Sequence, residues 1–275
     1  MKNLNKIILI LIAIAISGCQ SNSHKSTDSK IIFKDKLGNQ ITLKDLEGAT
    51  GNYDWQIVSN KNIPKEANQL HQEARALGQN GDYNGTIKKL NKAYGIAPNW
   101  PYPVYDLAFT YMLKKDFENA LKYYMLTDSI QPSGFFTAKT AVWCLRKEKE
   151  GEFKQGLYSA FVQLEWVQDE GVKLELLKNI LEKYPTFAPA WKEYANRIEN
   201  IDERLSAVKK GLNCYPDLET KGSLLIDEAI ITNLKGDTEK AIDKLGRIIV
   251  NSETTISNKE MAKFVLASLV KQKEE

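Results

Sequence analysis

The chain has 275 residues, 43% of them hydrophobic, and its 38 basic residues nearly balance its 35 acidic ones. That balance, together with a sequence that shows no basic stripe, excludes the electrostatic footprint of a nucleic-acid-binding protein. The apolar content is large enough to bury a long core.

The beginning of the chain has the pattern of an export signal. Two lysines precede an unbroken apolar run at 7–16, which is too short to span a bilayer because a spanning helix needs about 20 residues. The following Ile16-Ser17-Gly18-Cys19 resembles the bacterial lipoprotein cleavage box, in which the cysteine is acylated and becomes the new N-terminus. This resemblance implies a signal peptide at 1–18 and a membrane anchor on Cys19. The alternative is a plain signal peptide with an incidental cysteine.

Residues 19–30 are predicted to be a flexible tether from the lipidated cysteine. They are rich in Ser, Asn, Lys and Thr, and no apolar cluster is present to order them. In proteobacterial lipoproteins an aspartate directly after the cysteine favours retention in the inner membrane, and here Gln20 stands in that place. The resemblance therefore implies an exported protein that is anchored to a membrane, with the outer membrane favoured.

In residues 31–60 the apolar side chains recur with a period of two, the spacing of a β-strand. Apolar residues alternate at 31–35 and again at 41–43, with a turn signal at Leu37-Gly38-Asn39 between them, which predicts a short β-hairpin. A lone hairpin is only marginally stable in water, so we expect it to pack on the segment that follows. A loop is predicted at 49–62.

From Gly81 onward the chain repeats itself at a fixed interval. Gly81-Asp82-Tyr83 is matched by Lys115-Asp116-Phe117, and Pro98 by Pro132, so the offset is 34 residues. Apolar residues inside each unit recur at helical spacing. Each unit is therefore predicted to consist of two helices joined by a polar turn.

This pattern resembles the tetratricopeptide repeat (TPR) family, in which an aromatic residue follows the turn and a proline closes the second helix. The family also needs small residues where the paired helices cross, because helix axes closer than about 9 Å leave no room for a branched side chain. The resemblance implies an all-α fold, a right-handed α-α superhelix (TPR solenoid), here with a short N-terminal β-hairpin. The small positions are Ala74, Thr86, Ala93, Ala108, Ala120 and Thr127.

The array is predicted to extend over 64–252 with less regular edges after Pro132. A third turn at Gly151-Glu152-Phe153 comes two residues later than the period requires. The helix predicted at 173–184 ends at a proline without a first helix of its own, so the phase of the repeat slips there. The remaining predicted helices are 136–150, 153–168, 191–197, 204–215, 224–234 and 240–250, followed by a C-terminal capping helix over 256–275 that Ser257-Asn258 caps.

The sequence offers little for catalysis, so we expect no enzyme activity. The folded part holds one histidine, His71, and the chain has no phosphate-binding loop, nucleophile elbow or Cys-x-x-Cys. Acidic pairs occur at Asp227-Glu228 and at Glu148 with Glu150, but pairs on helix faces are solvated, and no neighbour is expected to raise a pKa. No metal and no cofactor is expected. Cys144 and Cys214 are predicted to be buried free thiols.

In the TPR family, ligands bind a concave groove lined by the first helix of each pair. In the second unit this mapping gives an extra aromatic stripe, which has two interpretations. The stripe packs against the neighbouring repeat or the hairpin, or it forms a binding surface for an extended peptide end or an acidic segment. The groove positions are Asn68, His71, Arg75, Tyr102, Tyr105, Phe109, Met112, Lys139, Trp143 and Arg146.

Two function classes follow from this resemblance. The first is a membrane-anchored scaffold for protein-protein interaction that holds another protein of the bacterial cell envelope, as TPR lipoproteins in outer-membrane assembly or pilus biogenesis do. The second is a glycan- or small-ligand-binding lipoprotein that uses the aromatic groove. Because the chain lacks the large insertions of TPR-like glycan-uptake lipoproteins, we favour the scaffold.

Overall fold

The computed structural model describes residues 29–34, 40–41, 54–59 and 62–274 of the chain, and the side chains of 62–269. Twelve α-helices, one 3₁₀ helix and three short strands make up this described part. The predicted signal peptide, Cys19 and most of the tether lie outside it, so they stay predictions.

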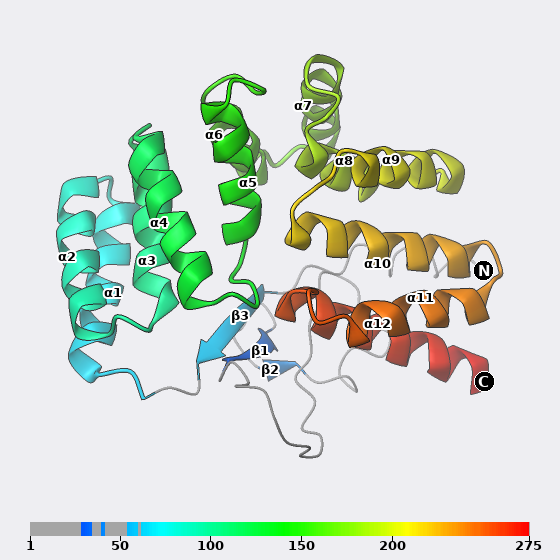
Figure 1. Cartoon of the computed structure of the whole chain (residues 1–275), viewed down its shortest axis with the longest axis horizontal. Helices are drawn as coiled ribbons and strands as arrows, with labels where there is room; N and C mark the ends of the chain where they lie inside the picture. The colour runs from blue at the N-terminus through cyan, green and yellow to red at the C-terminus, as the bar shows by residue number, and fades with distance from the viewer. Residues whose placement is uncertain (1–28, 35–39, 42–53, 60–61, 275) are drawn as a thin grey trace. The chain divides into compact units, whose positions relative to one another are not determined.

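The chain divides into two compact units (Figure 1). One consists of Ser59–Gln168, and the other of the described residues after Gln168 together with those before Ser59. We call the helices of the former the first array and those of the latter the second array. The division falls where the repeat slips in phase, because the helix after Gln168 has no first helix of its own to pair with.

The first array is built from antiparallel helix pairs. Helix α1 packs on α2 and α3 on α4, while contacts of α2 with α3 and of α4 with α5 join one pair to the next. Figure 1 shows these helices standing side by side. Its elements are α1 (Lys65–Gln79), α2 (Tyr83–Ile96), α3 (Pro101–Leu113), α4 (Phe117–Ile130), α5 (Ala138–Lys149), α6 (Leu157–Val162) and the 3₁₀ helix η3 (Gln163–Trp166).

The 34-residue period recurs in backbone geometry. At equivalent positions of the first two turns, Gly81 and Lys115 both adopt a left-handed conformation, with φ of 81° and 60°. The next residues, Asp82 and Asp116, each cap the following helix by accepting a backbone N–H three residues on, at 2.9 and 3.1 Å. All six predicted small positions are buried, which confirms the register of the helix crossings.

The third pair departs from the prediction. Gly151 has a φ of 81°, as the turn requires, but α6 begins at Leu157 and not at residue 153. Glu152 follows the turn where the first two pairs have an aspartate, and it pairs with Lys147 without capping the helix. The start of α6 is held by Glu148 of α5, which is only 7% exposed and accepts two backbone N–H groups. The expectation that Glu148 is solvated is therefore wrong.

In the second array α8 packs on α9, and α10 packs on α11. Helix α12 packs on both α10 and α11. Two apolar clusters fill it, one around Leu224 and one around Leu245. The predicted helices of this region are all present. They are α7 (Glu170–Lys183), α8 (Ala188–Ala195), α9 (Ile201–Asn213), α10 (Leu218–Leu234), α11 (Thr238–Val250) and α12 (Ile256–Glu274).

Two polar residues of the second array lie in its interior. Asp227 is 5% exposed and forms a two-pronged ion pair with buried Arg204, and burial raises the pKa of Asp227 against the pull of that arginine. The expectation of a solvated Asp227 is therefore wrong. Asn258 does not cap α12, which begins at Ile256; its amide is buried and donates to the carbonyl oxygen of Glu219 at 2.9 Å.

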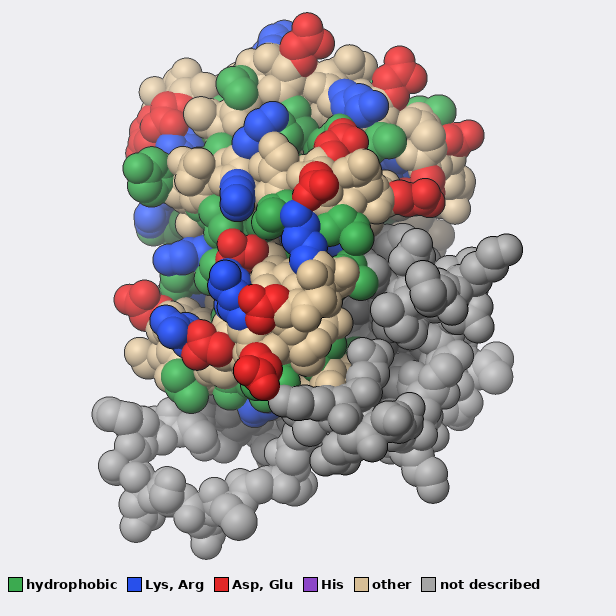
Figure 2. Space-filling model, turned by 90° about the vertical axis from the view of Figure 1, so that its right-hand side faces the viewer, with side chains coloured by type: hydrophobic (Ala, Val, Ile, Leu, Met, Phe, Trp, Pro, Cys, Tyr) green, Lys and Arg blue, Asp and Glu red, His purple; other side chains and the backbone are tan. Residues whose placement is uncertain are grey.

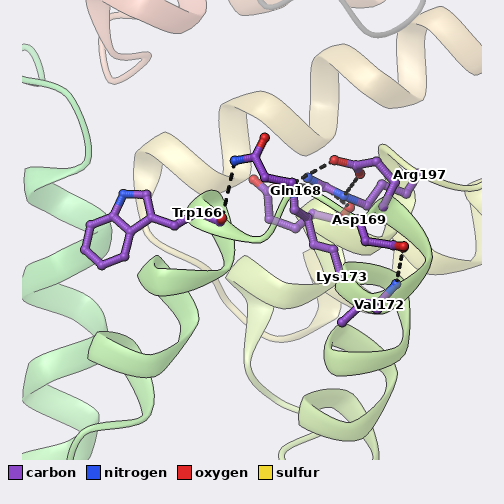
Figure 3. A network of polar contacts seen from close by, with 8 residues as sticks. Trp166, Gln168, Asp169, Val172, Lys173 and Arg197 are labelled. Atoms are coloured by element: carbon purple, nitrogen blue, oxygen red, sulfur yellow. Dashed lines mark hydrogen bonds and ion pairs between the residues drawn. The ribbon is translucent and has the colours of Figure 1, made fainter.

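An ion-pair network joins α7 to α8 within the second array (Figure 3). Arg197 binds Glu193 at 2.7 Å and Glu170 at 3.0 Å. Lys173, buried on α7, binds the same Glu170 at 2.7 Å. The network ties the first helix of the second array to the end of the next one.

Three strands precede the helices. β1 (Ser29–Lys34) pairs antiparallel with β2 (Gln40–Ile41), with Phe33 opposite Ile41, and the sheet order is β2-β1-β3. The turn predicted at 37–39 lies outside the described residues, so the hairpin itself stays a prediction. The loop predicted at 49–62 is wrong in part, because β3 covers Asp54–Ser59, a segment whose Ile and Val favour a strand.

Candidate functional site

The first helices of the three pairs in the first array lie side by side. His71 of α1 binds Asp106 of α3 through Nε2 and Oδ2, 2.8 Å apart. The hydroxyl groups of Tyr105 on α3 and of Thr137, the residue before α5, share a hydrogen bond of 2.9 Å. These two contacts link α1 to α3 and α3 to the start of α5. We call the exposed and half-buried groove positions predicted on these three helices the first-helix face.

Two of the predicted groove residues are buried. Met112 is 1% exposed because it continues the core stripe of Val104 and Ala108 at four-residue spacing. His71 is 6% exposed, and its ring packs edge-on against Trp100, with 4.9 Å between the ring centroids. Both belong to the packing of the helices and offer no surface to a partner, so these two assignments are wrong.

Two members of the aromatic stripe pack against the next repeat. Tyr102 meets Phe135 and Phe136 edge-on, with ring centroids 4.9 and 5.5 Å apart. Tyr105 lies 5.6 Å from Phe135 and 5.2 Å from Phe136. For these two residues the packing interpretation therefore holds, although both keep a half-exposed edge.

Phe135 and Phe136 are the site residues that sequence mapping missed. Phe135 is 1% exposed, and Phe136 lies half-buried with a φ of 49°. A signal for Phe136 was present, since it stands 34 residues after Tyr102 and so occupies the same place in the repeat. The structure adds that the irregular segment before α5 turns both rings toward α3.

Phe109 of α3 and Trp143 of α5 are half-buried aromatic side chains of the first-helix face, and they also stand 34 residues apart. The Trp143 ring packs at 5.7 Å from Phe153, and the Lys147 ammonium lies 5.1 Å from its centroid. One part of this indole is thus covered by its own repeat. The part that stays exposed adds, with Phe109, apolar surface to the first-helix face.

Charge on the face comes from arginine. Arg75 and Arg146 are exposed, and within the described part of the chain neither forms an ion pair with an acidic side chain. Lys139, by contrast, binds Asp128 at 2.5 Å, so its charge is offset. Asn68 is exposed on α1, the helix that also carries Arg75. The face therefore combines two unpaired cations with half-buried aromatic rings.

The described part of the second array has at least two cavities. One, of about 420 Å³, lies between α10 and α11, where Lys244 binds Glu228 and Arg247 binds Asp243. The other, of about 300 Å³, is lined by α7, α8 and α9 and includes the half-buried Trp191. The Lys210 ammonium lies 4.9 Å from the indole centroid and covers one side of it.

Other chemistries lack support in the described residues. No group of three or more His, Cys, Asp or Glu in this part of the chain is placed to hold a metal ion. No described helix has the length and apolar content needed to cross a membrane. Figure 2 shows basic and acidic side chains interspersed over one face of the molecule.

No family model and no curated protein matches the sequence. Among solved structures, the chain is similar to MamA (residues 41 to the end) from Desulfovibrio magneticus RS-1, with 13% identity, a TM-score of 0.34, and coverage of 68% of this chain and 94% of that one. It is similar to TTC0263, a TPR protein of Thermus thermophilus, with 15% identity, a TM-score of 0.31, and coverage of 74% and 98%. It is also similar to PilW, a type IV pilus biogenesis factor, with 16% identity, a TM-score of 0.33, and coverage of 75% and 99%.

Likenesses at this level carry no inference about function. The helix pairing, the left-handed turn residue and the aspartate caps described above define the architecture by themselves. The fold is a TPR-like array of helix pairs.

Proposed function

We propose that this protein is a non-enzymatic interaction scaffold, held at a bacterial membrane by an acylated Cys19, that docks another envelope protein on its first array. In this proposal the pairs of the first array wind as a right-handed superhelix, with the first-helix face on the concave side. The partner is an extended, acidic segment. No cofactor takes part.

The observation that supports this function is the composition of the first-helix face. Exposed Arg75 and Arg146 carry charge that no acidic side chain of the described residues offsets, so an acidic partner meets no internal competitor. On the same face Phe109 and Trp143 supply half-buried aromatic surface of the kind that often dominates interface energies. A face that combines unpaired arginines with aromatic rings suits a peptide with carboxylates beside an apolar anchor.

The docking test is capture of partners from the native envelope by the full chain. Arg146→Glu and Arg75→Glu should each weaken capture, and raising the salt concentration should weaken capture by the unmodified chain. Lys88→Glu is the matched control, because Lys88 is an exposed lysine on the second helix α2. If Lys88→Glu weakens capture as much as Arg146→Glu does, the partner is attracted by overall charge and the first-helix face is not its site.

Anchoring is tested separately. The wild-type chain should fractionate with membranes, and Cys19→Ser should leave it unprocessed or soluble. Processing of the wild type should be sensitive to globomycin, an inhibitor of lipoprotein signal peptidase. Insensitive processing would support the plain signal peptide and leave the docking proposal untouched.

Binding of a glycan or another small ligand is the second candidate. It is favoured by the cavity of about 300 Å³ in the second array, which sets Trp191 and Tyr194 beside polar side chains. Calorimetric titration of the full chain with envelope glycans, with Trp191→Ala as the disabling variant, distinguishes the two functions. Heat that Trp191→Ala abolishes would favour this candidate, and no heat from any glycan would reject it.

A further inference from the structure

Helix α7 carries an apolar surface that its own array leaves exposed. It packs on α8, and Lys173, Leu177 and Leu181 are the buried side chains of that contact face. Val172 and Leu176 lie on another side of the helix and are 47% and 37% exposed. Terminal helices of a repeat array normally have a polar outer face, so two such side chains on the first helix of an array need a partner.

The exposed residues belong to a stripe that runs the whole length of α7. With 3.6 residues per turn, residues four apart lie on one side of a helix, which places Val172, Leu176 and half-buried Ile180 together. Residues seven apart share that side as well, so Asp169 and Lys183 continue the stripe at its two ends. Both charged residues are exposed, and Asp169 caps the helix by accepting the N–H of Val172 at 2.9 Å (Figure 3).

The stripe is complementary to itself. Asp169 and Lys183 lie seven residues to either side of Leu176, and Val172 and Ile180 lie four residues to either side of it. If two α7 helices cross antiparallel at Leu176, Asp169 of each copy faces Lys183 of the other, and Val172 faces Ile180. A two-fold contact of this kind is closed and uses one surface twice, as most symmetric dimers do.

We propose that the second array pairs with a second copy of this chain through this stripe of α7. The order acid, three apolar residues, base is what an antiparallel pairing requires, because each acidic helix start then meets a basic helix end. One pair of 14-residue helices buries less than the ~1,200 Å² of a standard interface. The dimer should therefore be weak, with a Kd on the order of micromolar.

The test is the mass of the full chain in mild detergent, measured by sedimentation over a range of protein concentrations. The unmodified chain should shift from monomer to dimer as concentration rises, and Leu176→Glu should raise the Kd at least tenfold. Val250→Glu is the matched control, since Val250 is 81% exposed at the end of α11 and should leave the Kd unchanged. A chain that stays monomeric at its highest soluble concentration, or a dimer that Leu176→Glu leaves intact, overturns the proposal.

The charged ends of the stripe provide a rescue experiment. Lys183→Glu places like charges opposite each other at both ends of the interface and should weaken the dimer. Adding Asp169→Asn removes that repulsion while keeping a good helix cap, so the double variant should regain part of the affinity. No recovery in the double variant contradicts the predicted register.

Oxidative cross-linking identifies the occupant. Leu176→Cys should form a covalent dimer across the two-fold axis, whereas Glu175→Cys, on an exposed and different side of the same helix, should not. Equal cross-linking at both positions overturns the geometry. Cross-linking of Leu176→Cys in cells to a protein of another mass overturns the second copy as the occupant of the stripe.

Discussion

The carboxylate of Glu148 lies 2.6 Å from the backbone nitrogen of Tyr158 and accepts its N–H. The other carboxylate oxygen accepts the N–H of Gly156 at 2.7 Å. In the first two helix pairs an aspartate caps the helix that it begins, and here a residue of the preceding helix takes over that role. Burial raises the pKa of Glu148, and the two N–H bonds act against that rise. In the third pair a single buried carboxylate thus caps the second helix, α6.

Replacing Glu148 should loosen α6. Glu148→Ala leaves two backbone N–H groups at the helix start without their acceptor, at a cost of about 1–3 kcal/mol each. Hydrogen exchange of the Gly156 and Tyr158 amides should accelerate in the variant. Glu150→Ala, an exposed acid at the end of the same helix α5, should leave both amides protected. Unchanged exchange in Glu148→Ala would mean that another group caps α6.

Two aromatic residues of the first-helix face should have different roles, one in folding and one in docking. Tyr105 contacts three rings, those of Tyr124, Phe135 and Phe136, and each aromatic pair is worth about 0.5–1.5 kcal/mol beyond the area it buries. Tyr105→Ala should therefore lower the melting temperature clearly. Phe109→Ala should lower it less and weaken partner capture. The result that contradicts this division is a Phe109→Ala chain that melts earlier than Tyr105→Ala.

The network on α8 predicts a loss of stability in acid. Burial alone would raise the pKa of Glu193. The positive charges of Lys192 at 3.0 Å and Arg197 at 2.7 Å outweigh this effect of burial, and the pKa falls from 4.5 to about 2. The ionised carboxylate is therefore favoured in the folded state. Its contribution is fully present above pH 4.5 and is lost as pH falls from 4.5 towards 2.

Glu193→Gln tests this linkage. Denaturant unfolding of the wild type between pH 5 and pH 2 should show a steeper loss of stability than unfolding of the variant. The difference between the two proteins should be largest at the upper end of this range and shrink towards the lower end. Parallel curves for the two proteins would show that Glu193 has the same pKa in the folded and unfolded states.

Two glycine substitutions in the second array should have opposite effects on stability. Gly222 of α10 faces α12, whereas Gly246 has open space around it. A Cβ at Gly222 would lie 2.2 Å from Asn258 Nδ2 and 2.9 Å from its Cβ, so Gly222→Ala should cost about 1–3 kcal/mol by overpacking. Gly246 lies within α11 with no atom inside 4 Å of its added Cβ, so Gly246→Ala should stabilise by about 0.5–1 kcal/mol.

A double-mutant cycle checks the cause of the Gly222 effect. In an Asn258→Ala background the clash is gone, so Gly222→Ala should cost less than it does in the wild type. Asn258→Ala alone should also destabilise, because it removes the hydrogen bond to the carbonyl of Glu219. Equal costs of Gly222→Ala in both backgrounds would rule out Asn258 as the obstructing side chain.

The sequence by itself determined the helix pairs. Asp82 and Asp116 cap at the interval that was read from the chain, and Ala74, Ala108 and Ala120 are buried where helices cross. These features could be predicted because a turn, a cap and a small residue at a crossing depend on side chains within one repeat. The break in phase before residue 173 was visible for the same reason, and the two arrays divide there.

Only the tertiary structure decided which polar and aromatic residues are buried. His71 is buried because Asp106, 35 residues on, meets it from the next pair, and Asp227 because Arg204, 23 residues back, lies opposite. Met112 is a different case, because its four-residue spacing from Ala108 and Val104 already indicated the core position in which the structure buries it. The environment of a side chain depends on neighbours distant in sequence, and helical periodicity alone does not record which of them it will meet.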